Sequence, residues 1–168
     1  MNWADFAREA PELARLAEER FEATGLCLIG TIRRDGTPRI SPIEPLIAHS
    51  HLYLGMMWQS QKALDLLRDP RCLVHSTVSN KDGTEGEVKL RGRVLEVPDP
   101  AERERFGLAL FEKTGWRPPG PYHLFALDIQ DAAFVKFSSD GDQTVMRWRA
   151  GGAVQSHVRK WTGSGYAD

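Results

Sequence analysis

The chain has 168 residues, of which 22 are Lys or Arg and 23 are Asp or Glu, so its formal net charge is −1. This near-neutral balance excludes a general nucleic-acid binder, whose phosphate contacts require a marked cationic excess. An apolar share of 41% and a mean hydropathy of −0.41 are typical of a globular domain. No apolar run approaches the roughly 18 residues of a spanning helix, and the opening segment lacks the apolar centre of a signal peptide. We therefore expect a cytoplasmic protein with no membrane or nucleic-acid partner.

The opening segment, residues 3–23, is predicted to form an amphipathic helix. Its apolar side chains recur at helical spacings of three and four: Trp3, Phe6, Ala10, Leu13, Ala17 and Phe21. The pair Thr24-Gly25 then ends the helix.

Short strands joined by turns dominate the chain from residue 26 to about residue 150. The expected strands are 26–34, 37–47, 52–58, 72–78, 87–97, 122–137 and 143–150. Asp35-Gly36 favours a tight hairpin turn. Because proline cannot donate to a strand ladder, the prolines of segment 37–47 place it at an edge or make it leave the sheet partway. Gly92 is expected to mark a bulge or a bend.

Two further helices are expected between these strands. One begins at Ser60 and ends before Pro70. The other runs from Asp99 to about Thr114, and Asp99 with Glu102 has the spacing of a capping box.

Together the elements predict an α+β fold, mainly β with helices, in which six or seven antiparallel strands form a small barrel. The chain 1–168 is expected to be one domain. Its parts are the helix 3–23, the barrel over about 26–150 and a flexible tail over 151–168.

The cysteines and histidines do not have the spacing of a metal site. Cys27 and Cys72 each lie in a short apolar run, belong to no C-x-x-C pair and are expected to be buried packing residues. His49 and His51 flank the tip of a hairpin and are expected at the surface. His75 is expected in the core or in a pocket wall. No metal is predicted.

The segment from Gly36 to Arg71 carries the most specific chemistry. Ser60 stands at a helix start with Lys62 two residues inside, and a helix N-terminus with a flexible lysine favours an anion. Arg39 and Ser41 share one face of the preceding strand. If segments 37–47 and 52–58 pair as a hairpin, Arg39 approaches the helix start, and the cluster suits a phosphoryl group. Taken alone, Ser60 and Lys62 are better explained as a serine cap and a solvated lysine, because S-x-K is common at helix starts.

The order of these motifs resembles the flavin-binding split β-barrel proteins related to pyridoxamine 5′-phosphate oxidase. The shared motifs are D-G-x-P at 35–38, R-x-S-P at 39–42, L-Y-L at 52–54, S-x-K at 60–62 and D-P-R at 69–71. The resemblance covers about residues 10–150. It implies a split β-barrel homodimer that binds FMN between its two protomers.

The resemblance also implies which residues bind the cofactor. Arg39, Ser60 and Lys62 match positions that hold the flavin phosphate. The other expected cofactor-binding residues lie along the isoalloxazine ring and the ribityl chain or beside the phosphate: Ser41, Pro42, Ile43, Met56, Met57, Trp58 and Gln61. Trp148 or the loop 115–123 is expected to reach across the dimer, although Trp148 is equally well explained as a core residue.

The expected function is an FMN-dependent oxidoreductase that transfers hydride to or from a small conjugated substrate. No catalytic residue is predicted, because the cofactor carries the chemistry. The chain lacks the R-x-H-D-R motif of the true oxidase and has Gln61 where that enzyme has arginine. Oxidation of pyridoxine phosphate is therefore not expected.

Two alternatives remain open. One is a reductase that uses the deazaflavin coenzyme, whose oligoglutamate tail could follow Arg33, Arg34, Arg68 and Arg71, although such arginines are often only a solvated face. The other is a non-catalytic flavin- or haem-binding protein.

Overall fold

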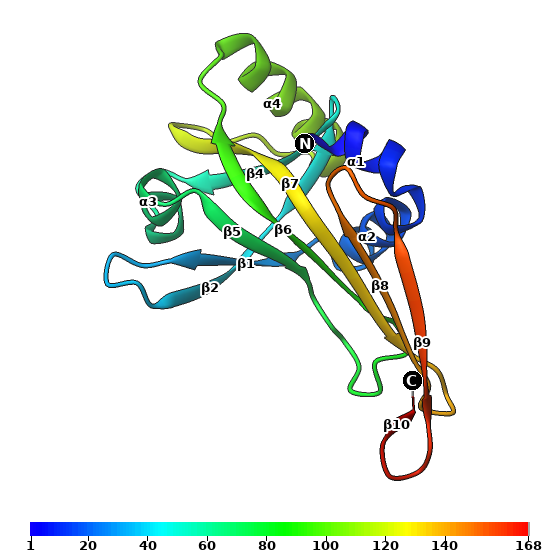
Figure 1. The fold of residues 1–168 in the computed structure, drawn as a ribbon. Coiled ribbons are helices and arrows are strands. Elements are labelled where there is room, and N and C mark those ends of the chain that lie inside the picture. Colours follow the sequence, from blue (N-terminus) through cyan, green and yellow to red (C-terminus); the bar gives the residue numbers. More distant parts are fainter. Residues whose placement is uncertain (168) are drawn as a thin grey trace.

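The computed structural model describes residues 1–167, in which antiparallel strands form one twisted, unclosed sheet with four helices packed around it (Figure 1). The helices are α1 (Trp3–Glu9), α2 (Pro11–Thr24), α3 (Gln61–Arg68) and α4 (Pro100–Thr114). The strands are β1 (Cys27–Ile32), β2 (Pro38–Ile43), β3 (Pro45–Ala48), β4 (His51–Met57), β5 (Arg71–Ser76), β6 (Glu87–Glu96), β7 (Tyr122–Phe137), β8 (Gln143–Arg149), β9 (Gln155–Trp161) and β10 (Tyr166–Ala167). The predicted α+β class and antiparallel split barrel are confirmed.

The sheet is organised around β7, the longest strand. Its first residues, Tyr122–Ala126, pair with β4, and its last residues, Asp131–Phe137, pair with β8. The opposite edge of β7 pairs with β6 along most of its length. The order then continues from β6 through β5 and β1 to β2 at the edge. The register between β6 and β7 shifts at Gly92, which confirms the predicted bulge.

The expected strand 37–47 is two strands, and this corrects the predicted hairpin. β2 pairs with β1, whereas β3 pairs with β4, and the chain changes partner at Glu44. Prolines on both sides of Glu44 cannot donate to a ladder, so the chain leaves one partner and joins another there. The hairpin is therefore limited to β3 and β4, with His49 and Ser50 in left-handed conformation at its tip.

The expected helix 3–23 is also divided. Pro11 stands at the first position of α2, and Ala10, with φ −137°, separates α2 from α1. A proline is tolerated at a helix start but not in its interior, so the chain bends there. The two helices lie together on one side of the sheet, away from α3 (Figure 1).

The segment expected as a flexible tail is largely paired. β9 forms an antiparallel pair with β8, and β10 pairs with β9. The rings of Trp161 and Tyr166 meet edge to face at 5.2 Å between centroids. Together with the division of 37–47, these strands bring the number within residues 1–167 to ten rather than six or seven. Residue 168 lies outside the described residues.

The interior consists of two apolar clusters. The larger one joins the inner face of the sheet to α1, α2 and α3, and the smaller one lies beneath α4 around Tyr53 and Phe106. Cys27 and Cys72 are buried as predicted, and burial raises the pKa of each thiol to about 12. Trp148 packs against Phe6 in the larger cluster, so the structure supports its core assignment.

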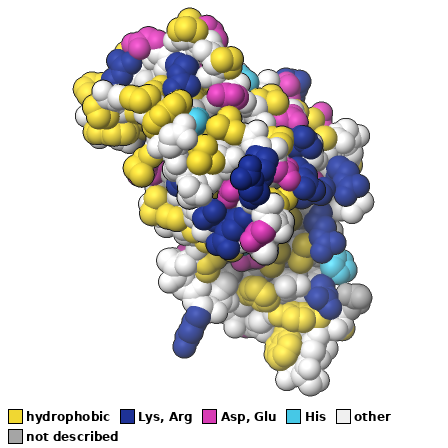
Figure 2. All heavy atoms as spheres, turned by 90° about the vertical axis from the view of Figure 1, so that its left-hand side faces the viewer, with side chains coloured by type: hydrophobic (Ala, Val, Ile, Leu, Met, Phe, Trp, Pro, Cys, Tyr) yellow, Lys and Arg dark blue, Asp and Glu magenta, His cyan; other side chains and the backbone are white. Residues whose placement is uncertain are grey.

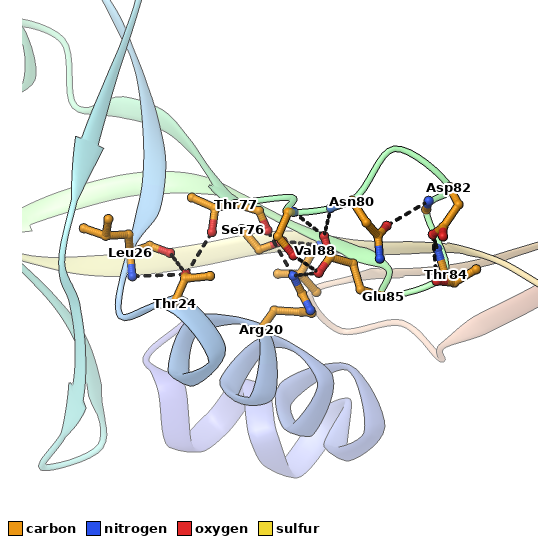
Figure 3. Close-up of polar contacts among 12 residues, drawn as sticks. Arg20, Thr24, Leu26, Ser76, Thr77, Asn80, Asp82, Thr84, Glu85 and Val88 are labelled. Carbon is orange, nitrogen blue, oxygen red and sulfur yellow. Dashed lines mark hydrogen bonds and ion pairs between the residues drawn. The ribbon is translucent and has the colours of Figure 1, made fainter.

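A polar network ties α2 to the loop between β5 and β6 (Figure 3). Arg20 forms an ion pair with Glu85 at 2.9 Å and donates to the carbonyl of Thr77 at 3.2 Å. Glu85 also accepts hydrogen bonds from the hydroxyl of Ser79 at 2.6 Å and the amide of Asn80 at 3.2 Å. Hydrogen bonds from Ser79, supported by Arg20, lower the pKa of Glu85 to about 2.

Candidate functional site

β2 presents two chemically different faces. Arg39, Ser41 and Ile43 alternate with outward residues and point to the inner side of the sheet, toward α3. The outward side carries Ile40 and Pro42, which are exposed. The structure therefore confirms that Arg39 and Ser41 share a face.

A buried carboxylate, Asp65 of α3, holds Arg39 in place. Asp65 is only 4% exposed, and its Oδ2 accepts from Nε of Arg39 at 2.7 Å and from the hydroxyl of Thr31 at 3.0 Å. Its Oδ1 accepts from Nη2 of Arg68 at 3.3 Å. Burial by itself would raise the pKa of Asp65, but hydrogen bonds from Arg39, Thr31 and Arg68 outweigh it and hold the pKa below its ordinary value.

Lys62 forms a second link between α3 and β2. Its Nζ donates to the carbonyl of Pro42 at 2.6 Å. Burial lowers the pKa of Lys62, against the opposing influence of Glu44 and Cys27. Lys62 and Asp65 are three residues apart and so lie on one side of α3, which is the side that faces β2.

The start of α3 leaves a polar group unsatisfied. Gln59 has φ 57°, in the left-handed region, and this turn delivers Ser60 to the N-cap position. The hydroxyl of Ser60 makes no capping hydrogen bond, so the alternative that Ser60 serves only as a cap is not supported. Within residues 1–167 this Oγ is buried and has no hydrogen-bond partner. A buried hydroxyl without a partner is costly, so a ligand atom is its natural complement.

An open groove of about 690 Å³ lies between α3 and the β1–β2 hairpin. Four arginines dominate its lining, and two acids, a glutamine and a leucine complete it: Arg33, Arg34, Arg39, Arg68, Asp35, Asp65, Gln61 and Leu64. Figure 2 faces this side of the molecule and shows dark blue basic side chains gathered across its middle, with fewer acidic ones among them. The groove is therefore electropositive although the whole chain carries a formal charge of −1.

The expected residues at the end of β4 do not share one environment. Met56 is buried in the larger core, whereas Met57 is 79% exposed on the other side of the strand. Trp58 is 53% exposed and stacks on the buried ring of His123, with centroids 4.5 Å apart and an interplanar angle of 11°. Trp58 thus offers a flat, supported aromatic surface.

The structure brings together the polar part of the predicted site. Its residues lie on β2 (Arg39, Ser41), at the N-cap of α3 (Ser60) or in α3 (Gln61, Lys62), and the facing sides of β2 and α3 are linked by hydrogen bonds. Sequence reasoning missed Asp65, and it assigned Arg68 only to a basic track for the tail of the deazaflavin coenzyme or to a solvated face. The available signal was the spacing of three between Lys62 and Asp65 in a helix that runs along β2.

The donor set suits a phosphate group. The donors are the guanidinium groups that line the groove, the ammonium group of Lys62 and the unpartnered hydroxyl of Ser60. The first-turn N–H groups of α3, an eight-residue helix, complete the set. Phosphate oxygens accept from all of these donors, and the helix dipole adds to the attraction. No cluster of three metal-ligating side chains occurs among the described residues. Over the same part of the chain, no helix is both long and apolar enough to cross a bilayer.

Comparison with known proteins gives a family match. The sequence model of the family described as "Pyridoxamine 5′-phosphate oxidase" matches residues 13–136, well over half of the chain. No curated protein matches.

Solved structures share the fold at low sequence identity. A pyridoxamine 5′-phosphate oxidase-related, FMN-binding protein of Nostoc punctiforme has a TM-score of 0.61 and 12% identity, over 90% of this chain and 97% of that one. PhzG of Burkholderia lata 383, in complex with tetrahydrophenazine-1-carboxylic acid, has a TM-score of 0.65 and 12% identity, over 91% and 95%. A heme-binding protein of Mycobacterium smegmatis has a TM-score of 0.55 and 15% identity, over 84% and 57%.

Proposed function

This chain belongs to the pyridoxamine 5′-phosphate oxidase family, and we propose that it binds FMN and acts as an FMN-dependent oxidoreductase on a small conjugated substrate. The observation that carries the proposal is the buried, unpartnered hydroxyl of Ser60 at the start of α3, beside the basic groove. Solved structures with the same fold include a protein described as FMN-binding.

In this proposal the chain supplies binding and orientation. Arg39, Ser60 and Lys62 hold the phosphate, and the linked faces of β2 and α3 fix where that phosphate lies. The backbone of β2 from Ser41 to Ile43 and the supported ring of Trp58 flank the remainder of the cofactor, while the side chain of Ile43 is buried in the larger core and that of Pro42 points outward. When bound, FMN would supply hydride chemistry at N5 of its ring, which asks no general acid or base of the protein.

We further propose that the protein is a homodimer through the outer face of β1, β2 and β5. Ile40, Gly30 and Leu73 lie side by side across these three strands, and Ile40 is 72% exposed. Exposed apolar residues in a row on an uncovered sheet face are typical of a protein interface. A second copy on this face would contact the edge strand β2, whose opposite face lines the proposed cofactor site.

The deazaflavin coenzyme is a second candidate, favoured by the groove itself. Arg33 and Arg34 line the groove together with Arg39 and Arg68, which extends the basic surface beyond a single phosphate. An anionic tail would be attracted along this surface. Arg71, in contrast, pairs with Asp69 at 2.6 Å and does not line the groove.

Haem is a less favoured candidate. A heme-binding protein shares the fold. However, no histidine lines the groove in the part of the chain that the structure describes, and His123 lies buried beneath Trp58. An axial imidazole from the groove wall is therefore not in place.

The test is a cofactor titration on the purified protein, followed by absorbance and by flavin fluorescence. We expect FMN to bind and to show the two-band absorbance of oxidised flavin, and we expect Arg39→Ala with Lys62→Ala to abolish this binding. The matched control, Arg15→Ala with Lys81→Ala, removes the same charge from exposed sites on α2 and on the β5–β6 loop and should bind normally. Unchanged FMN occupancy in the first variant would overturn the site, and tighter binding of the deazaflavin coenzyme than of FMN would overturn the cofactor.

A further inference from the structure

The basic groove contains a contact that the proposed phosphate site does not require. Asp65 is a buried carboxylate that faces two arginines at once, through Oδ2 to Arg39 and through Oδ1 to Arg68. Thr31 holds the same carboxylate from β1. A carboxylate inside an anion site repels the ligand, so its presence needs an explanation.

The geometry of the two arginines supplies one. Arg39 uses Nε for Asp65, and within residues 1–167 its terminal nitrogens donate no hydrogen bond. Arg68 uses Nη2 for both Asp65 and the carbonyl of Ile32, which restrains the guanidinium plane. Both side chains line the same groove. A guanidinium held at one side and open at the other is suited to bind two oxygens of one anion.

We infer that Asp65 is a positioning residue that holds Arg39 and Arg68 as a two-arginine clamp, and that Arg68 is a further anion-binding residue. The inference rests on the proposed function, because it assigns the clamp to the phosphate of the proposed cofactor. The clamp selects a phosphate monoester, with several equivalent oxygens, over a neutral hydroxyl at the same place.

The rigid support of the clamp distinguishes it from a solvated basic face. Asp65 is 4% exposed and is held by donors from three elements, namely β1, β2 and its own helix α3. Preorganised donors lose less side-chain entropy when the ligand binds. The neighbouring pair, Asp69 with Arg71, has the same charges at 2.6 Å, but Arg71 is well exposed and neither residue lines the groove.

The decisive test is Asp65→Asn, with affinities for FMN and for riboflavin measured by fluorescence titration. Charge alone predicts that removal of a carboxylate strengthens phosphate binding. Positioning predicts the opposite, namely a loss of about tenfold in FMN affinity with riboflavin affinity unchanged. Asp69→Asn makes the same charge change outside the groove and should leave both affinities unchanged. An Asp65→Asn variant that binds FMN as well as wild type, or better, overturns the inference.

A second pair of variants keeps the test decisive if Asp65→Asn fails to fold, which circular dichroism and loss of riboflavin binding would reveal. Arg68→Gln is expected to weaken FMN about fivefold and to spare riboflavin, whereas Arg71→Gln should change neither. Equal affinities of Arg68→Gln and Arg71→Gln for FMN would contradict the role of Arg68.

The clamp can also be separated from the cofactor proposal. If wild type binds neither FMN nor riboflavin, the proposed function fails. Inorganic phosphate then serves as the probe, because the clamp still predicts that it raises the melting temperature of wild type and of Asp69→Asn, but not of Asp65→Asn or Arg68→Gln. Equal stabilisation of all four proteins would overturn the clamp.

Discussion

Ser60 occupies the position of a helix cap without performing that role. A serine at an N-cap ordinarily accepts a hydrogen bond from the first helical turn, and its loss costs about 1 kcal/mol. The hydroxyl of Ser60 makes no such bond and lies buried beside a basic groove. Replacement of Ser60 by alanine therefore tests whether this serine stabilises the helix or binds a ligand.

We predict that Ser60→Ala leaves the free energy of unfolding unchanged, or raises it by about 1 kcal/mol, because an unsatisfied buried hydroxyl is removed. FMN affinity should fall about tenfold, the value of a hydrogen bond to a charged group. Chemical denaturation and fluorescence titration measure the two quantities. Ser164→Ala, at an exposed position, is the control. A variant that loses stability but binds FMN normally would identify Ser60 as a cap.

At the scale of elements, one carboxylate joins α2 to the β5–β6 loop, beside two hydrogen bonds between α2 and Thr77. Glu85 joins Arg20 of α2 to Ser79 and Asn80 of the loop (Figure 3). Its folded pKa of about 2 lies below the ordinary value of 4.5. Such a group stabilises the fold fully above pH 4.5, and the contribution is lost as the pH falls toward 2.

We accordingly predict that Glu85→Gln is less stable than wild type at pH 7, and that the difference shrinks between about pH 4.5 and pH 2. Urea denaturation at a series of pH values measures this. Glu18→Gln, an exposed change on α2, the helix that carries Arg20, should stay parallel to wild type over that range. A stability difference between Glu85→Gln and wild type that does not vary with pH would contradict the ion-pair role of Glu85.

The elements also show which features the sequence could reveal. α4 begins where predicted because its signal is local: the carboxylate of Asp99 accepts from the amides of Ala101 and Glu102. The change of partner at Glu44 was not predictable in detail. Prolines indicate that a strand ladder is interrupted, but they do not indicate which strand the chain pairs with next. β9 was missed because its side chains are mostly exposed and do not alternate, so its pairing with β8 leaves no hydrophobic period.

The residues of the candidate site also fall into those with a local sequence signal and those without one. Arg39, Ser60 and Lys62 could be predicted because each stands in a short motif at a strand or at a helix start. Asp65 could not, because its significance comes from contacts with Thr31 and Arg39, which lie 34 and 26 residues away in sequence. Long-range polar contacts of this kind carry no periodic signal.

At the scale of the whole molecule, one sheet face remains uncovered in a single copy of the chain. The row of Ile40, Gly30 and Leu73 crosses β2, β1 and β5 on the side opposite the core. Burial of this face against a second copy would remove apolar surface from water and contribute favourably to association.

We predict that wild type is a dimer by size-exclusion chromatography with light scattering, and that Ile40→Asp is a monomer, because a charge would be buried at the centre of the interface. FMN affinity should fall in the same variant if the cofactor lies between protomers. Leu108→Asp, at a similarly exposed apolar position on α4, should remain a dimer. A dimeric Ile40→Asp would place the interface elsewhere.

The pairing of the long strand β7 has a consequence for local unfolding of the sheet. β4 and β8 pair with one edge of β7, and β6 pairs with the other edge. The part of the sheet that contains β4 and the part that contains β8 are therefore both hydrogen-bonded to the same strand. Neither part can detach without exposing amides of that common strand, so no natural hinge divides the sheet. Opening should be all-or-none, with the amides of β7 among the slowest to exchange with deuterated water.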